Sequence, residues 1–369
     1  MAENVPDGNV EKAALSPQPS AVSRQSQPLP AADEVRVPYV SWFSKRGISD
    51  CRLNGLFTTR AREPLVRDYP VGVYVGASLG ISPSIGDNLW AELLMSNPTL
   101  APELVRRYLA ALGVPQREPS IDALRELVAA HLTRVPFENI SKLHNRKHHG
   151  LTTLPPIELY LDGIQRYHFG GTCYSNNFHF YTLLTALGYD VKLCGADMTH
   201  PDVHLVILAT LDSHEYLVDA GYGAPFLAPL PRDLTTDYVI ALGRDRYVLK
   251  PQDSSLRSRL EIYRDGQPLH GYLVKPAPRR IEEFAQVIAD SFRPSATFLN
   301  ALLLVRFYPD RALLIHNLTL VESHGSESAV HQLGSCDELV AKVADLFGMP
   351  RAIVAEVVSE LGELQDVWT

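Results

Sequence analysis

The sequence Gly170-Gly171-Thr172-Cys173 stands directly before a predicted helix over residues 174–188. Apolar residues at positions 180, 183, 184 and 187 are spaced as on one face of a helix, and Gly188 is suited to end it. The two glycines let the backbone turn sharply before the helix. Unpaired N–H groups and the helix dipole favour a thiolate at such an N-terminus. The stretch therefore predicts a reactive cysteine at position 173.

Downstream, His204 opens the run 204–211, which is short and rich in β-branched residues and so predicts a strand. A second predicted strand ends near Asp219, and the two strands form a predicted hairpin. Directly opposed hairpin residues are an odd number of positions apart when the loop is even, and His204 and Asp219 differ by 15. We expect both side chains to point the same way. Cys173, His204 and Asp219 then read as nucleophile, base and orienting carboxylate.

Four segments in the same order resemble the signature of the arylamine N-acetyltransferases. They are the run Val-Pro-Phe-Glu-Asn-Ile at 135–140, the Gly-Gly-x-Cys element, His204, and Val-Asp-Ala-Gly-Tyr-Gly at 218–223. The resemblance covers roughly residues 101–365 and is weakest in the last third. It implies an α+β, cysteine-protease-like acetyltransferase fold with a helical domain, a β-barrel domain and an α/β lid.

The resemblance also implies a reaction. Members of this family transfer an acyl group from acetyl-coenzyme A to an amine by a ping-pong route, so acetyl-CoA is the expected co-substrate and a small-molecule amine is the acceptor. We expect no bound metal, for the reason given below. By resemblance Cys173 is the nucleophile, His204 the base and Asp219 the orienter. Phe137 is expected to line the acceptor pocket. The residues expected beside the coenzyme are Gly221, Tyr222 and Gly223.

Two positions depart from the family pattern. The family usually has Arg before the two glycines and Glu two residues after the cysteine, where this chain has Phe169 and Ser175. Glu138 thereby loses its expected arginine, and a buried carboxylate needs another partner. We expect Glu138 either to be solvated or to find His168 or Arg166, which are close in the sequence. We also expect a more apolar pocket and an acceptor preference that moves away from simple arylamines.

The pattern along the chain predicts five regions. Residues 1–36 read as a disordered tail, and residues 37–100 as an N-terminal extension without an assigned role. The predicted helical domain with the nucleophile spans 101–190, the β-barrel domain with the histidine and aspartate 191–285, and the α/β lid 286–369. Individual elements expected outside the site are a helix at 120–133, strands at 301–308 and 312–321, and helices at 336–347 and 350–363.

The net charge argues against nucleic acid and anionic membranes as partners. The formal net charge is −8 and the pI about 5.9, which offers no global attraction for nucleic acid or an anionic membrane. The N-terminus lacks an apolar signal-peptide core, and no window approaches 18 consecutive apolar residues. We expect a cytoplasmic protein, and the oligomeric state stays open.

Three alternative functions stay open. A transglutaminase-like or other cysteine amide hydrolase shares the triad, although the 31-residue spacing from Cys173 to His204 is far from the roughly 130 residues of papain-like enzymes. A metal site is suggested by His144, His148 and His149, but the neighbouring lysines and arginines favour a solvated segment. A non-catalytic binding member of the family is suggested by the departures.

Overall fold

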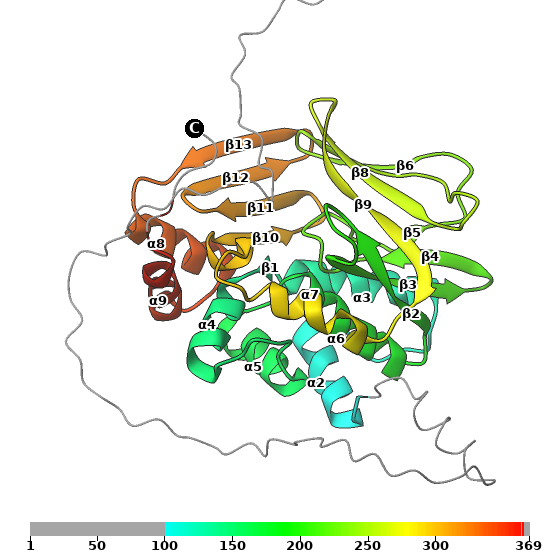
Figure 1. Cartoon of the computed structure of the whole chain (residues 1–369), viewed down its shortest axis with the longest axis horizontal. Coiled ribbons are helices and arrows are strands. Elements are labelled where there is room, and N and C mark those ends of the chain that lie inside the picture. Colours follow the sequence, from blue (N-terminus) through cyan, green and yellow to red (C-terminus); the bar gives the residue numbers. More distant parts are fainter. Residues whose placement is uncertain (1–99, 363, 365–369) are drawn as a thin grey trace, which may run out of the picture. The chain divides into compact units, whose positions relative to one another are not determined.

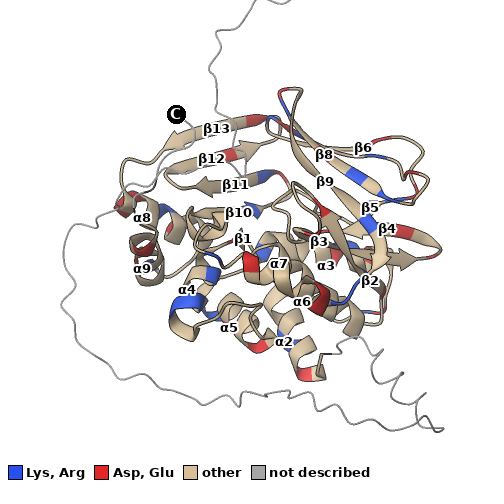
Figure 2. Cartoon of the chain, in the orientation of Figure 1, with Lys and Arg blue, Asp and Glu red and all other residues tan. Residues whose placement is uncertain are grey.

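The structure is a computed structural model that describes residues 100–362 and 364 (Figure 1). The predicted tail at 1–36, and the predicted extension at 37–100 except for its last residue, therefore lie outside the described residues. Basic and acidic residues are interspersed along the described helices and strands (Figure 2). Among the helices described, none is long and apolar enough to cross a bilayer.

The first part of the described chain is helical. Ser120 caps the helix predicted at 120–133, its hydroxyl accepting a hydrogen bond from the Ala123 amide at 3.2 Å. The helix predicted after the two glycines is present and begins at Cys173, one residue before the predicted start, and Gly188 follows it with φ of 87°. The elements are α2 (Pro102–Leu112), α3 (Ile121–Arg134), β1 (Phe137–Glu138), α4 (Ile140–His149), α5 (Ile157–Tyr167) and α6 (Cys173–Ala186).

A nearly closed antiparallel sheet of eight strands follows, in the order β5-β4-β3-β2-β9-β8-β7-β6. The predicted hairpin is β3 and β4, joined by Asp212 and Ser213, whose positive φ values of 50° and 66° suit a tight two-residue turn. The strands are β2 (Asp190–Asp197), β3 (His204–Leu211), β4 (His214–Val218), β5 (Leu230–Pro231), β6 (Tyr238–Leu242), β7 (Asp245–Leu249), β8 (Ser258–Arg264) and β9 (Gln267–Pro278).

The last part of the chain builds a second antiparallel sheet, in the order β1-β10-β11-β12-β13, with two helices after it. Its edge strand β1 comes from the helical part, so this sheet is continuous with the segment that precedes α4. The elements are η1 (Ile281–Phe284), α7 (Ala285–Asp290), η2 (Thr297–Leu299), β10 (Leu303–Phe307), β11 (Arg311–His316), β12 (Thr319–His324), β13 (Glu327–Gln332), α8 (Cys336–Phe347) and α9 (Arg351–Leu361).

One predicted strand in this region is wrong. The run 312–321 reads as a single apolar strand, but the structure breaks it into β11 and β12 at Asn317, whose φ is 51°. Asparagine tolerates this left-handed conformation better than other non-glycine residues. Its side-chain oxygen also accepts a hydrogen bond from the Leu302 amide at 2.8 Å, which fixes the turn.

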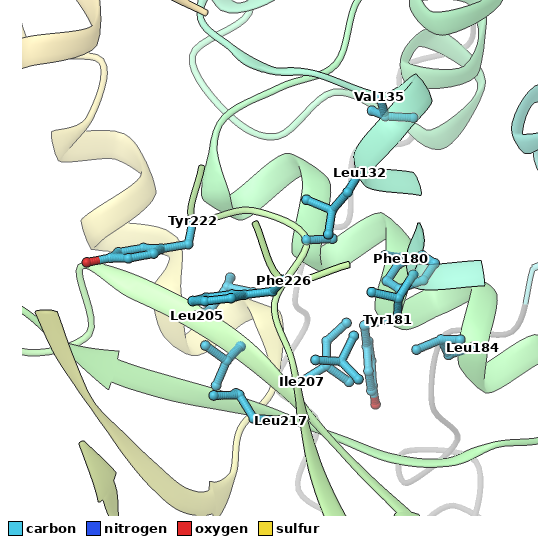
Figure 3. Close-up of a cluster of buried hydrophobic side chains, with 14 of the residues drawn as sticks. Leu132, Val135, Phe180, Tyr181, Leu184, Leu205, Ile207, Leu217, Tyr222 and Phe226 are labelled. Carbon is cyan, nitrogen blue, oxygen red and sulfur yellow. The ribbon is translucent and has the colours of Figure 1, made fainter. Parts of the chain in front are cut away.

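The hydrophobic core places α6 against the first sheet. Phe180, Tyr181 and Leu184 of α6 belong to the same buried cluster as Leu205 and Ile207 of β3 (Figure 3). Because burial of such apolar side chains is the main favourable contribution to folding, this packing fixes the helix on the strand. The start of α6 and the start of β3 are thereby brought together.

Candidate active site

Cys173 is the first residue of α6, and its free thiol is half-buried. The first amide of this helix with a helical partner is that of Asn176, which donates to the Thr172 carbonyl at 3.0 Å. The N-cap side chain of Thr172 makes no capping hydrogen bond, and no acidic residue lies in the first turn. The amides around Cys173 are therefore available to an anion.

His204 and Asp219 meet in the core beside this helix end. The imidazole Nε2 of His204 donates to Oδ2 of Asp219 at 2.8 Å, and the two residues are 1% and 2% exposed. Ile207 pairs with Val218, and extending this register places Asp219 diagonally across from His204. Cys173 also acts on this imidazole and favours its charged form, which raises the pKa of His204. The side chains of Cys173, His204 and Asp219 therefore lie together at the start of α6.

The charges of His204 and Asp219 stabilise each other. Burial opposes charge on His204, but the Asp219 carboxylate and the hydrogen bonds to Asp219 and Cys173 outweigh it and raise the pKa of the imidazole. Burial likewise works against the Asp219 carboxylate, yet the charge of His204 and three side-chain hydrogen bonds hold the pKa of that carboxyl below its usual range. An imidazolium paired with a carboxylate at neutral pH follows from both shifts.

Two residues that sequence reasoning missed complete the carboxylate's surroundings. The Asn177 amide nitrogen donates to Asp219 Oδ1 at 2.8 Å, and the Tyr272 hydroxyl donates to Oδ2 at 2.8 Å. Asn177 lies on α6, four residues after Cys173. Because residues four positions apart share one face of a helix, this spacing could have predicted its place beside the site. Tyr272 lies on β9, whose prolines and glycine hide a strand in the sequence. Both fix the orientation of Asp219.

Gly221 lies directly against the nucleophile's backbone. A Cβ atom at this position would stand 2.7 Å from the Cys173 carbonyl oxygen and 2.8 Å from its Cα, well inside van der Waals contact. The Gly221 amide also donates to Asp219 Oδ1 at 3.1 Å. The glycine thus lets the loop after β4 pack on the start of α6.

The neighbouring residues Tyr222 and Gly223 differ in setting. Tyr222 is buried, its ring lies 5.2 Å from that of His204, and its hydroxyl is 2.6 Å from Nδ1 of His270. Gly223 has φ of 74°, and a Cβ there would reach the Phe137 ring at 3.6 Å. The structure therefore groups the residues expected to bind coenzyme with Phe137, the residue expected to line the acceptor pocket.

We expect Gly221→Ala to lower the rate of acyl transfer by about 10²-fold, because a methyl group here pushes the nucleophile out of line. Gly334→Ala is the matched control, since a Cβ there meets only Glu338 Oε2, at 3.6 Å. Steady-state rates and circular dichroism of both variants are the measurement. Equal rates for the two variants would contradict the tight packing of Gly221 on Cys173.

The expected rescue of Glu138 by His168 or Arg166 is wrong. Glu138 is fully buried, and its two oxygens accept hydrogen bonds from the amides of Ser141 and Gly170, each at 2.9 Å. One backbone N–H group at the start of α4 and one in the glycine pair before α6 thus take the place of the arginine that the sequence lacks. Burial nevertheless raises the pKa of this carboxyl. His168 instead lies against Gly348, a Cβ of which would be 3.3 Å from its ring.

The residue at the arginine position, Phe169, is an apolar core residue. It is 2% exposed and belongs to the second hydrophobic cluster with Ile140 and Leu143. Its ring centroid lies 5.2 Å from that of Tyr167. Phe169 therefore makes the environment directly before the glycine pair apolar, and the expectation of a more apolar acceptor pocket stays a prediction.

The histidines of α4 are only partly brought together. His144, His148 and Glu356 of α9 place three potential ligand atoms within 4.8 Å of one another, whereas His149 is not part of this group. Glu356 already binds His148 Nε2 at 3.0 Å and Lys147 Nζ at 2.8 Å. An ion-pair cluster accounts for this arrangement, and the expectation of no bound metal stays a prediction.

Comparison with known proteins finds relatives of this chain. A family model described as N-acetyltransferase matches residues 120–352. Arylamine N-acetyltransferase, pineal gland isozyme NAT-3, of Gallus gallus is 28% identical over 251 residues, which cover 59% of this chain and 83% of that protein. N-malonyltransferase FDB2 of Gibberella moniliformis is 33% identical over 125 residues, covering 29% of this chain and 35% of that protein.

Solved structures share the fold. Arylamine N-acetyltransferase of Mycobacterium marinum in complex with CoA has a TM-score of 0.59 at 22% identity, covering 70% of this chain and 99% of that one. The Salmonella typhimurium enzyme has a TM-score of 0.59 at 20% identity, with coverages of 70% and 99%. Because the family model matches more than half of the chain, this chain belongs to the arylamine N-acetyltransferase family.

Proposed function

We propose that this enzyme transfers an acetyl or other short acyl group from acyl-CoA to an amine through a thioester on Cys173. The observation that carries the proposal is the buried hydrogen bond between His204 and Asp219, 2.8 Å long, beside the half-buried Cys173 thiol at the start of α6. One related protein is named an N-malonyltransferase, so the acyl group of the proposal is not restricted to acetyl. The complex of a similar structure with CoA supports the choice of donor.

In the first half-reaction the Cys173 thiolate attacks the carbonyl carbon of the thioester. The proton that left the thiol resides on His204, whose raised pKa keeps the imidazole protonated. Backbone amides at the start of α6 are placed to hold the oxyanion, and one such donor contributes about 3 kcal/mol to the transition state. Collapse expels the coenzyme thiolate, which takes the proton from His204.

In the second half-reaction an amine attacks the acyl-enzyme. Neutral His204 takes the amine proton as the new bond forms, and Cys173 leaves as the thiolate. Asp219, held by four hydrogen bonds, keeps the imidazole oriented and stabilises its charge. Phe137, whose ring lies 5.8 Å from that of Phe298, offers an aromatic wall to the acceptor.

The test of this function is a product analysis with acetyl-CoA and a series of amines. We expect the amounts of free CoA and of acylated amine to be equal, and initial rates to give the parallel double-reciprocal lines of a ping-pong mechanism. Release of CoA without acylated amine would instead identify a hydrolase. Binding of acetyl-CoA without either product would identify a non-catalytic member of the family.

We expect the acceptor preference to lie outside the simple anilines. Phe169 is an apolar core residue where the family has a charge, and Ser175 replaces a second charge next to the nucleophile. The measurement compares kcat/KM for anilines, hydrazines and aliphatic amines at a fixed concentration of acetyl-CoA. Fastest turnover with unsubstituted aniline would show that these two substitutions leave the acceptor site unchanged.

A further inference from the structure

A small pocket, partly open to solvent, adjoins the start of α6. Residues on both sides of Cys173 in the chain line it, and its far wall comes from α4 and from the segment after α7. Lys142 is the single Lys, Arg, Asp, Glu or His among the lining residues that the structure describes. The lining residues used below are Lys142, Thr172, Ser175, Ser291 and Phe292.

The Lys142 ammonium has no anionic partner among residues 100–362 and 364, where no carboxylate oxygen lies within 4.0 Å of it. Its Nζ donates to the Ser291 hydroxyl at 2.7 Å and lies 4.0 Å from the centre of the Phe292 ring. An ammonium has three N–H donors, so this geometry leaves donors for a ligand. The lysine is held in the pocket without being neutralised.

The positive charge of Lys142 lies in the pocket beside the Cys173 nucleophile. Thr172 and Tyr174, the neighbours of Cys173 in the chain, line the same pocket as Lys142. Burial lowers the pKa of Lys142 to about 8, while negative charge on Cys173 acts in the opposite direction. The lysine remains protonated at pH 7. The dipole of α6 and the hydroxyls of Thr172 and Ser175 add further positive potential and donors to the same pocket.

We propose that Lys142 selects acyl groups that end in a carboxylate, malonyl first, by pairing with that carboxylate while the thioester carbonyl reacts at Cys173. The inference rests on the proposed function, because it concerns the acyl group carried by the same cysteine. In a malonyl group the carboxylate carbon lies two bonds beyond the thioester carbonyl carbon, so it stays beside the nucleophile. The phosphates of CoA are separated from the thioester by the whole pantetheine arm and do not fit this position.

The chemistry of loading is unchanged by the extra carboxylate. Cys173 sulfur bonds to the malonyl carbonyl carbon, the carbon–sulfur bond to CoA breaks, and the CoA thiolate takes the proton of His204. The malonyl carboxylate enters and leaves as an anion and exchanges no proton. Its pairing with Lys142 neutralises a partly desolvated charge, which makes the contact stronger than one at the surface.

The test measures the rate of acyl-enzyme formation with acetyl-CoA and with malonyl-CoA, by mass spectrometry of rapidly quenched protein. We expect the wild-type enzyme to load malonyl faster than acetyl, and Lys142→Met to lower malonyl loading by roughly 10- to 100-fold while leaving acetyl loading within about threefold. Lys147→Met is the matched control, because it removes the same charge from the same helix at an ion pair with Glu356. It should leave the ratio of the two rates unchanged.

The possible outcomes distinguish failure of the proposed function from failure of the inference about Lys142. Absence of any acetyl or malonyl adduct on wild-type Cys173 would defeat the proposed function itself. Faster loading of acetyl than of malonyl by the wild-type enzyme would overturn the inference, and this result does not depend on how any variant folds. An equal loss for both donors in Lys142→Met would also overturn it, because a role in binding CoA affects both donors alike.

Discussion

Replacing Cys173 with serine is expected to lower acyl transfer by at least about 10⁴-fold, because a hydroxyl cannot replace the thiolate that carries the acyl group. The fold should survive, since the residue is half-buried and serine has nearly the same shape. Activity with acetyl-CoA and a good acceptor, together with the thermal midpoint, is the measurement. Activity within tenfold of wild type would remove Cys173 from the proposed mechanism.

Cys194 is the internal control for this variant. It is fully buried on β2, and burial raises the pKa of its thiol to about 12 despite the nearby charge of Arg232. We therefore expect Cys194→Ala to keep its activity, with a loss of stability only. Iodoacetamide at neutral pH should alkylate Cys173 well before Cys194. The reverse order of labelling would contradict the assignment of the nucleophile.

Asp219→Asn is expected to lower the rate of acyl transfer by about 10⁴-fold while the protein still folds. An amide can select the wrong histidine tautomer and cannot stabilise an imidazolium. Removing only the Tyr272 hydroxyl, in Tyr272→Phe, takes away one hydrogen bond at 2.8 Å and leaves the charge, so we expect a much smaller loss. Steady-state kinetics of the two variants side by side is the measurement. Similar losses for both would show that the charge of Asp219 is not what matters.

The same pair makes stability depend on pH in two directions. The pKa of Asp219 is lowered in the fold, so its contribution is present above its unfolded pKa of about 3.9 and is lost as pH falls through the folded value. The pKa of His204 is raised, so its contribution is complete below about 6.5 and is lost as pH rises through the folded value. We expect Asp219→Asn to flatten both slopes in urea unfolding measured across pH.

Sequence alone predicted the elements that carry the site but not the contacts that orient them. The glycine pair, the periodicity of α6 and the β-branched run at His204 are local signals, and each element begins where they place it. Hairpin arithmetic placed the His204 and Asp219 side chains on one face, but it did not fix the register that brings them into contact. The surroundings of Glu138 could not be predicted, because backbone amides that bind a carboxylate leave no mark on residue identity.

Strand pairing between segments far apart in the sequence could not be predicted either. Strand β1 is two residues long and pairs with β10, more than 160 positions later, so no local period announces it. The partner of Asp219 on β9 was hidden for a similar reason, since Pro268, Gly271 and Pro276 argue against a strand in an isolated sequence. Tertiary pairing overrode these local preferences.

The most direct test is the mass of the protein after a brief incubation with acetyl-CoA in the absence of any amine. The account predicts an increase by the mass of one acetyl group, located on the peptide that contains Cys173 and discharged when an amine is added. The Cys173→Ser variant should gain no such thioester. An unmodified Cys173 in an enzyme that still acetylates amines would contradict the thioester route.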